Sequence, residues 1–156
     1  MAMIIEGEER IAAPVETVWR ALNDPDVLKD CIPGCEALEK KSDTEFAATV
    51  SLKIGPIKAR FNGAVELTNL NPPNSYTISG EGKGSVAGFA KGGADVSLKP
   101  DGDGTTILTY QAKADVGGKM AQLGSRLIES TSKKLAAQFF ADFNARVSGA
   151  AGAESA

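Results

Sequence analysis

The longest amphipathic segment of the chain is its last one, residues 117–149. Apolar side chains recur there every three or four residues, at Met120, Leu123, Leu127, Leu135, Phe139, Phe143 and Val147. This spacing predicts a helix with one apolar stripe and one solvated face. About 28 helical residues reach roughly 42 Å, enough to cross a whole domain of this length. The apolar stripe therefore needs cover from the residues that precede it.

Between residues 37 and 116 the apolar positions alternate, which is typical of strands with one buried face. In residues 46–54, for example, Phe46, Val50 and Ile54 share one face. Short turns at Gly55-Pro56 and at residues 100–104 predict antiparallel hairpins. We expect strands at residues 3–11, 46–54, 57–67, 76–84, 85–99 and 106–116.

Two short helices are predicted after the first strand. Pro14 suits the first position of one helix, Asn23-Asp24-Pro25 ends it, and a second helical turn follows from Asp26 to Lys29. A twisted sheet that wraps around the long helix would bury both apolar surfaces. We therefore predict an α+β helix-grip fold with a curved antiparallel sheet of about six or seven strands. It forms a single domain over residues 1–148, followed by a disordered tail at 149–156.

Composition excludes several classes of function. The formal net charge is −3 and no basic patch is visible in the sequence, which argues against a nucleic-acid partner. No run of about 18 apolar residues predicts a transmembrane span. The charges in the first ten residues do not fit a signal peptide, so we expect a cytoplasmic protein. The absence of histidine removes His-based triads, most zinc sites and the usual general base near neutral pH.

No catalytic or metal-binding constellation can be assembled from the remaining residues. Cys31 and Cys35 flank a Pro-Gly bend, but zinc would need two further ligands. We interpret them as part of a structural turn, with a redox or partner-contact role as the alternative. Lys58, Glu66 and Glu81 alternate out of phase with the apolar set, so they face solvent. We predict no catalytic residue, no metal and no required cofactor.

Glycines and aromatic residues indicate where a ligand could bind. Gly80, Gly82 and Gly84 alternate, so one strand face lacks side chains. The plain interpretation is a bent sheet that lets the helix pack close, and the alternative is a cavity between sheet and helix. Aromatic residues predicted to face inward would line such a cavity, although core packing explains each of them singly. The candidate ligand-binding residues are Phe46, Phe61, Tyr76, Phe89, Tyr110, Met120, Leu123, Leu127 and Ile128.

The two halves of the long helix differ in bulk. Gly124 and Ser125 make the N-terminal half thin, so we expect a ligand against residues 120–128. Phe139 and Phe143 predict a solid core in the C-terminal half, against Trp19. On this interpretation Leu127→Trp should block binding and leave the fold intact.

Three motifs together resemble one known family. They are Ala13-Pro14 with Val18-Trp19, Asp24-Pro25 with Cys31-Ile32-Pro33-Gly34-Cys35, and Gly118-Lys119 through Gly124-Ser125-Arg126. Over about residues 1–147 the chain resembles the G subunit of carbon monoxide dehydrogenase (CoxG), within the START-like (SRPBCC) helix-grip superfamily. This resemblance implies a sheet that grips a long helix, with a deep apolar cavity between them.

For function, the resemblance implies a non-enzymatic accessory protein of a CO dehydrogenase-type molybdenum hydroxylase. It would bind a lipophilic molecule, such as a quinone or lipid, and help bring the enzyme to the cytoplasmic membrane by peripheral contact. The superfamily also includes aromatase-cyclases and hydrolase-like members. One alternative is therefore an enzyme that uses Tyr76, Tyr110 or Gln111 in the cavity. The other is an assembly factor with a filled core and no ligand.

Overall fold

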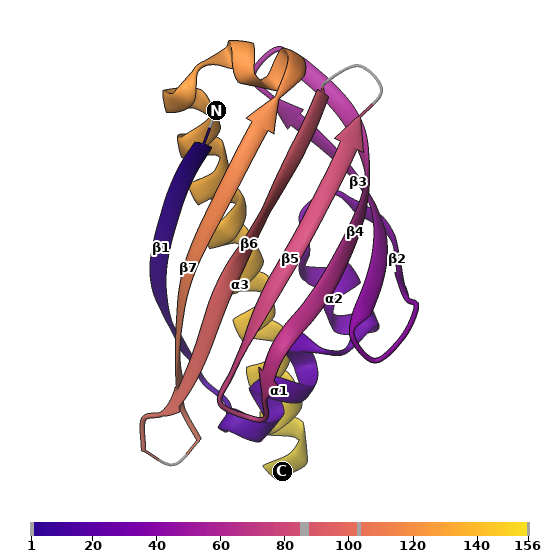
Figure 1. Ribbon diagram of the computed structural model, residues 1–156. Coiled ribbons are helices and arrows are strands. Elements are labelled where there is room, and N and C mark those ends of the chain that lie inside the picture. The colour runs from indigo at the N-terminus through magenta and orange to yellow at the C-terminus, as the bar shows by residue number, and fades with distance from the viewer. Residues whose placement is uncertain (1, 85–87, 103, 156) are drawn as a thin grey trace.

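The computed structural model describes residues 2–84, 88–102 and 104–155, without the side chains of Ala59 and of residues 149–155. An α+β fold is formed by these residues (Figure 1). In chain order the elements are β1 (Ala2–Ile11), α1 (Val15–Leu22), α2 (Pro25–Cys31), β2 (Cys35–Lys40), β3 (Glu45–Ile54), β4 (Ile57–Asn71), β5 (Ser75–Gly84), β6 (Gly88–Pro100), β7 (Thr106–Gly117), the 3₁₀ helix η1 (Gly118–Leu123) and α3 (Ser125–Ser155).

The strands form one seven-stranded sheet in the order β1-β7-β6-β5-β4-β3-β2, with antiparallel neighbours throughout. Consecutive strands are neighbours except that β1 joins β7, which brings the first strand beside the last. Figure 1 shows the sheet curving around α3, with α1 and α2 covering the end of the sheet nearer the C-terminus. The predicted fold class is confirmed. The charges of residues 6–10 do not interrupt β1, because Glu6 and Arg10 bind Gln111 and Asp101 at the protein surface.

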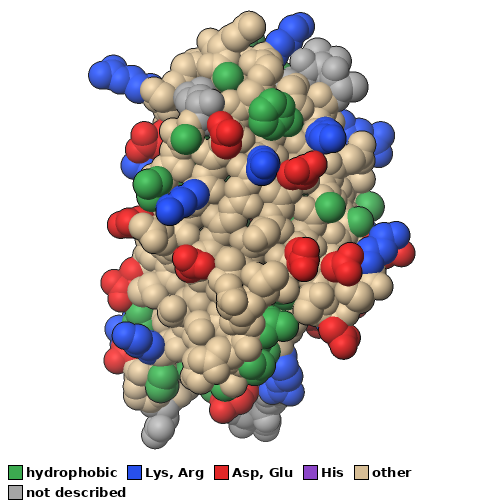
Figure 2. Space-filling model, in the orientation of Figure 1, with side chains coloured by type: hydrophobic (Ala, Val, Ile, Leu, Met, Phe, Trp, Pro, Cys, Tyr) green, Lys and Arg blue, Asp and Glu red, His purple; other side chains and the backbone are tan. Residues whose placement is uncertain are grey.

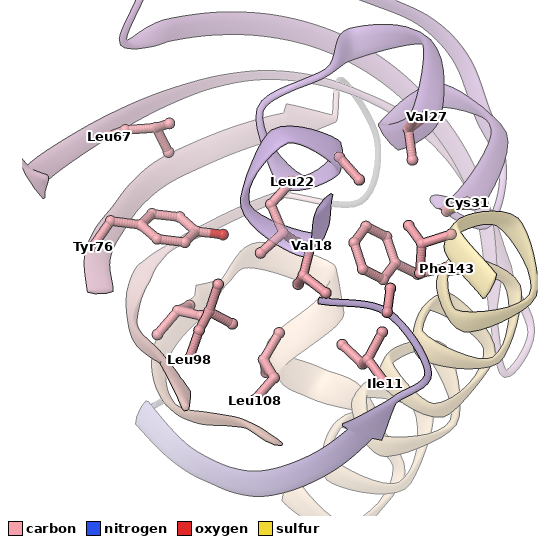
Figure 3. Packing of buried hydrophobic residues seen from close by; sticks show 14 of the residues in the cluster. Ile11, Val18, Leu22, Val27, Cys31, Leu67, Tyr76, Leu98, Leu108 and Phe143 are labelled. Atoms are coloured by element: carbon pink, nitrogen blue, oxygen red, sulfur yellow. The ribbon is translucent and has the colours of Figure 1, made fainter. Parts of the chain in front are cut away.

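The core divides into two clusters that follow the two halves of α3. The larger cluster surrounds Phe143, which is fully buried between β1, α1 and α2 (Figure 3). The smaller cluster contains Phe61, Met120 and Ile128 at the other end of the sheet. On the outer sheet face the charged side chains are exposed, as predicted for Lys58 and Glu66. Figure 2 shows that charges of both signs are scattered over this face.

The long helix begins later than predicted. Residues 118–123 form η1, and Gly124 follows with a φ of +92°. This left-handed conformation ends the 3₁₀ helix and redirects the chain, so Met120 and Leu123 do not belong to the α-helical stripe. At its other end α3 continues to Ser155. The predicted domain limit at residue 148 stays a prediction, because the described side chains end there.

Helix α3 crosses the concave side of the sheet without lying on its centre. Its backbone approaches the sheet most closely at β1 and β3, and it also approaches α1 and α2. Asn144 joins α3 to the end of β1, because its side-chain oxygen accepts a hydrogen bond from the Ala12 amide at 3.0 Å. Arg146 pairs with Asp30 of α2. Side chains and the two cavities described below lie between α3 and the central strands β4 to β6.

Candidate functional site

An apolar cavity of about 250 Å³ lies between the sheet, α1, α2 and the C-terminal half of α3. We call it the aromatic cavity. Every lining side chain is apolar except for the hydroxyl of Tyr76. The lining residues are Leu22, Leu28, Ile32, Leu38, Phe46, Ala48, Val65, Leu67, Tyr76, Ile78, Val96, Leu108, Phe139 and Phe140.

Tyr76 is the polar feature of the aromatic cavity. Its side chain extends from β5 with the hydroxyl pointing toward Leu22 of α1 (Figure 3), and it is only 4% exposed. No hydrogen bond joins this hydroxyl to a described residue. Burial raises the pKa of Tyr76, so the phenol stays protonated and can donate a hydrogen bond. Among the lining side chains, it is the hydrogen-bond donor that this cavity offers to a ligand oxygen.

A second apolar cavity of about 300 Å³ lies at the other end of the sheet, below the N-terminal half of α3. We call it the methionine cavity. The hydroxyls of Thr131 and Ser132 are half-buried at its wall. The lining residues are Met3, Val50, Leu52, Ile54, Phe61, Gly82, Ala90, Ala114, Val116, Met120, Ile128, Thr131, Ser132 and Leu135.

The glycines of the inner sheet face leave room below α3. A Cβ atom added at Gly82 would meet only strand atoms, the nearest at 3.9 Å, and none of α3 within 4 Å. The same test at Gly63, its partner across β4 and β5, also finds no atom of α3. Close packing of the helix on these glycines, the plain interpretation of the glycine pattern, is therefore wrong. The missing side chains leave space between sheet and helix.

The structure distributes the nine candidate residues over four places. Phe46 and Tyr76 line the aromatic cavity, whereas Phe61, Met120 and Ile128 line the methionine cavity. Three others are half-buried and line neither cavity. Tyr110 stacks on Phe140 at 5.4 Å, Leu123 packs against the smaller core cluster, and Leu127 lies close to Gly55. That any of them binds a ligand stays a prediction.

The inward orientation predicted for Phe89 is wrong. Its side chain is 43% exposed and lies over Gly117 of the neighbouring strand, on the outer face. The reason is alternation along β6: Val96 and Leu98 face inward, so residue 89 must face outward.

Sequence reasoning missed the residues from α1, α2 and β2 that wall the aromatic cavity. Leu22, Leu28 and Leu38 carried a signal, since each lies on the apolar side of its element, but that signal is the same for a solid core. The core predicted for the C-terminal half of α3 is confirmed at Phe143 and Val147, which are buried in the larger cluster, but it is not solid throughout. This half also borders a cavity, where Phe139 and Phe140 form part of the wall.

The described residues contain no group of three or more Cys, Asp or Glu that could hold a metal ion. The described cysteines are both free thiols. Burial raises the pKa of each thiol, so both stay protonated near neutral pH. Within the described part of the chain, no helix combines the length and the apolar character needed to span a membrane.

This arrangement, a seven-stranded antiparallel sheet gripping a long helix over apolar cavities, defines a START-like helix-grip protein. Residues 7–148 match the model of one family, the G subunit of carbon monoxide dehydrogenase (CoxG). The chain belongs to this family. The family is one of accessory rather than catalytic subunits.

Solved structures support the fold. A conserved protein from Geobacillus kaustophilus is similar at 31% identity and a TM-score of 0.89, over 94% of this chain and 96% of that one. A START superfamily protein from Mycobacterium smegmatis is 14% identical with a TM-score of 0.70, over 92% and 96%. The ZhuI aromatase/cyclase from Streptomyces sp. R1128 is 12% identical with a TM-score of 0.69, over 94% of both chains. No curated protein matches this chain.

Proposed function

We propose that this protein is a non-enzymatic accessory protein of a CO dehydrogenase-type molybdenum hydroxylase. It binds a lipophilic, quinone- or lipid-like molecule between the sheet and α3, and it helps bring the enzyme to the membrane. The observation that carries this proposal is the pair of apolar cavities below α3, which together offer one deeply buried hydroxyl. Burial of apolar area contributes about 25 cal/mol per Å² to ligand affinity before the costs of association.

An enzyme of the aromatase/cyclase type is the second candidate, because a fold neighbour carries that name. Such a reaction needs a positioned acid or base in the cavity. Among the described side chains that line the two cavities there is no carboxylate, lysine or arginine. Gln111 is exposed and bonds Glu6 on the outer face, which leaves Tyr76 as the polar candidate. A carrier role is therefore favoured over catalysis.

One end of the molecule has the character of a membrane-facing surface. Figure 1 places η1, the start of α3, the β3–β4 turn and the end of β5 at this end. Basic side chains are exposed on these segments, while nearby Glu81 and Glu129 pair with lysines. Exposed Phe89 lies across from the basic β5 terminus. Each basic residue near an anionic leaflet contributes about 1 kcal/mol. Apart from Lys83, which pairs with Glu81, the basic residues are Lys53, Lys58, Lys119 and Arg126.

Ligand binding is tested on protein purified from its native host. Native mass spectrometry should show a bound mass that organic extraction removes, and the extract should contain a lipophilic molecule. Titration of the extracted protein with a quinone should restore the bound species. Extracted protein that takes up no quinone, from a sample that carried no lipophilic mass, would count against the carrier function.

Recruitment is tested in two steps. Affinity capture of the tagged chain from the same host should recover a molybdenum hydroxylase. Sedimentation with anionic vesicles should retain the chain, and Lys119→Glu with Arg126→Glu should release it, whereas vesicles of neutral lipid should retain neither. The charge control is Lys29→Glu with Lys99→Glu, which changes the net charge by the same amount at two exposed positions outside this surface. Equal retention by neutral and anionic vesicles would contradict the electrostatic contact.

A further inference from the structure

The two cavities lie end to end below α3, and the sheet between them carries only small side chains on its three central strands. On β4, Gly63 lies between Val65 of the aromatic cavity and Phe61 of the methionine cavity. We call this zone the small-residue belt. It consists of Gly63 on β4, Gly80 on β5, and Gly92 and Ala94 on β6.

At Gly63, no atom of α3 lies directly against the belt. A Cβ atom at Gly63 would meet Glu81 O at 3.4 Å and Gly82 Cα at 3.9 Å, with no atom of α3 within 4 Å. The backbone of α3 approaches β1 and β3, on either side of these strands, most closely. From Tyr76 to Gly82 the strand rises about 20 Å. A narrow apolar chain could therefore run along β5 from one cavity into the other.

The polar groups at the two ends differ in their need for a partner. Tyr76 as a whole is only 4% exposed, and its hydroxyl has no hydrogen bond to a described residue. Thr131 and Ser132 are half-exposed, so water can satisfy their hydroxyls. Among the described residues, no fully enclosed side-chain oxygen or nitrogen lacks a partner, so the Tyr76 hydroxyl is open to the cavity and can donate a hydrogen bond to a ligand oxygen there. The oxygen of an elongated ligand is thus best placed at Tyr76.

We propose that both cavities take one elongated lipophilic molecule with a carbonyl or hydroxyl oxygen at one end. The Tyr76 hydroxyl holds that oxygen, and the apolar chain passes over the small-residue belt into the methionine cavity. The inference rests on the proposed ligand-binding function and adds the shape and the orientation of the ligand.

Fluorescence of Trp19 gives a direct measurement. It is the sole tryptophan of the chain, it lies against Tyr76, and quinones quench indole emission. Two probes are compared, a chainless 1,4-benzoquinone and the same ring with a decyl chain. The wild-type protein should bind the decyl probe at least about tenfold more tightly, since each buried methylene adds affinity.

Two variants test the belt and the anchor separately. Gly63→Val should abolish the extra affinity that the decyl group gives the probe and leave the affinity for the chainless probe unchanged. Ser79→Val, on the outer face of β5, should preserve that extra affinity. Tyr76→Phe should weaken both probes about threefold to tenfold, and this loss should exceed the loss in Thr131→Val, which also removes one wall hydroxyl. Gly82→Val repeats the test beside the belt, because a Cβ there meets nothing nearer than 3.9 Å.

The outcomes separate this inference from the proposed function. The continuous channel is overturned if the wild type binds the two probes equally. It is also overturned if both glycine variants keep the full extra affinity for the decyl probe. In either case ligand binding itself still stands. A larger loss in Thr131→Val than in Tyr76→Phe overturns the orientation. If neither probe quenches Trp19 or is retained in equilibrium dialysis, the inference and the proposed function fail together.

Discussion

The indole of Trp19 meets the ring of Tyr76 edge to face, with the ring centroids 5.3 Å apart and the planes at 84°. This contact joins α1 to β5 across the end of the aromatic cavity. Edge-to-face pairs contribute about 0.5–1.5 kcal/mol beyond their buried area. The indole covers part of the Tyr76 ring, so the same contact that stabilises the fold also holds the phenol in place at the cavity.

Stability should depend on alkaline pH through Tyr76. Burial raises its pKa above the usual value of 10. The unfolded chain then releases this proton near pH 10, whereas the folded chain keeps it. Ionisation of Tyr76 therefore does not change the free energy of unfolding below pH 10 and lowers it above pH 10. The free energy of unfolding should fall by about 1.4 kcal/mol per pH unit in that range. Urea unfolding at increasing pH measures this, and Tyr76→Phe should flatten the slope. An unchanged slope in the variant would contradict the assignment.

The Pro-Gly bend between the two cysteines should tolerate no side chain at Gly34. Gly34 has a φ of +76°, and an added Cβ would overlap the carbonyl oxygen of Ser51. The two residues are also held together by a hydrogen bond from the Ser51 amide to the Gly34 carbonyl oxygen at 2.9 Å. Gly34→Ala should therefore cost about 3 kcal/mol or more. Gly102 has the same φ with nothing within 4 Å of a Cβ, so Gly102→Ala should cost only about 1 kcal/mol. Chemical denaturation of both variants tests this, and equal losses would show that the overlap is relieved.

Thr106 should contribute to stability through one buried hydrogen bond. Its hydroxyl donates to the Ala13 carbonyl at 2.7 Å, and both residues are fully buried. Thr106→Val keeps the shape but leaves that carbonyl unpaired, which should cost about 1–3 kcal/mol. Thr109→Val, on the exposed face of β7, should stay within about 0.5 kcal/mol of the wild type. Thermal melting of both variants measures the difference, and similar melting temperatures would argue that water replaces the lost donor.

The sheet could be predicted from the sequence because alternation is a local signal that the tertiary structure preserves. Phe46, Phe61 and Tyr76 face inward as the pattern requires. Phe89 shows where a prediction from residue type fails. It is an odd number of residues from the inward-facing Val96, so alternation places it on the outer face, and only its aromatic character favours burial. Pattern is a better guide than residue type at this position.

The start of α3 and the two cavities were harder to predict, for different reasons. The apolar period continues from Met120 to Leu127, and only the φ of Gly124 separates the 3₁₀ helix from α3; glycine permits this conformation without requiring it. The cavities depend on how far α3 stands from the centre of the sheet. Phe139 and Phe140 have the same pattern whether the space before them is filled or empty.

The two cysteines should differ in reactivity. Cys31 is 2% exposed, whereas Cys35 is half-buried and donates to the Ala37 carbonyl. Since burial raises both pKa values and the thiolate is the reactive form, native protein should react slowly at Cys35 and at Cys31 only after unfolding. Mass spectrometry after timed alkylation measures both sites. Rapid modification at neutral pH would revive the redox interpretation of this motif.

Ligand affinity should respond to Ile128 and not to its neighbour Leu127, which revises the sequence-based prediction. Ile128 is 4% exposed and lines the methionine cavity. The Leu127 side chain instead lies against the β3–β4 turn, where a Cβ at Gly55 would be 2.8 Å from its Cδ2. Ile128→Trp should fill the cavity, reduce the affinity for a long-chain quinone at least about tenfold and leave the melting temperature near that of the wild type. Leu127→Trp should leave the affinity unchanged. Equilibrium dialysis of both variants distinguishes the two positions, and a loss confined to Leu127→Trp would move the ligand out of the methionine cavity toward the β3–β4 turn.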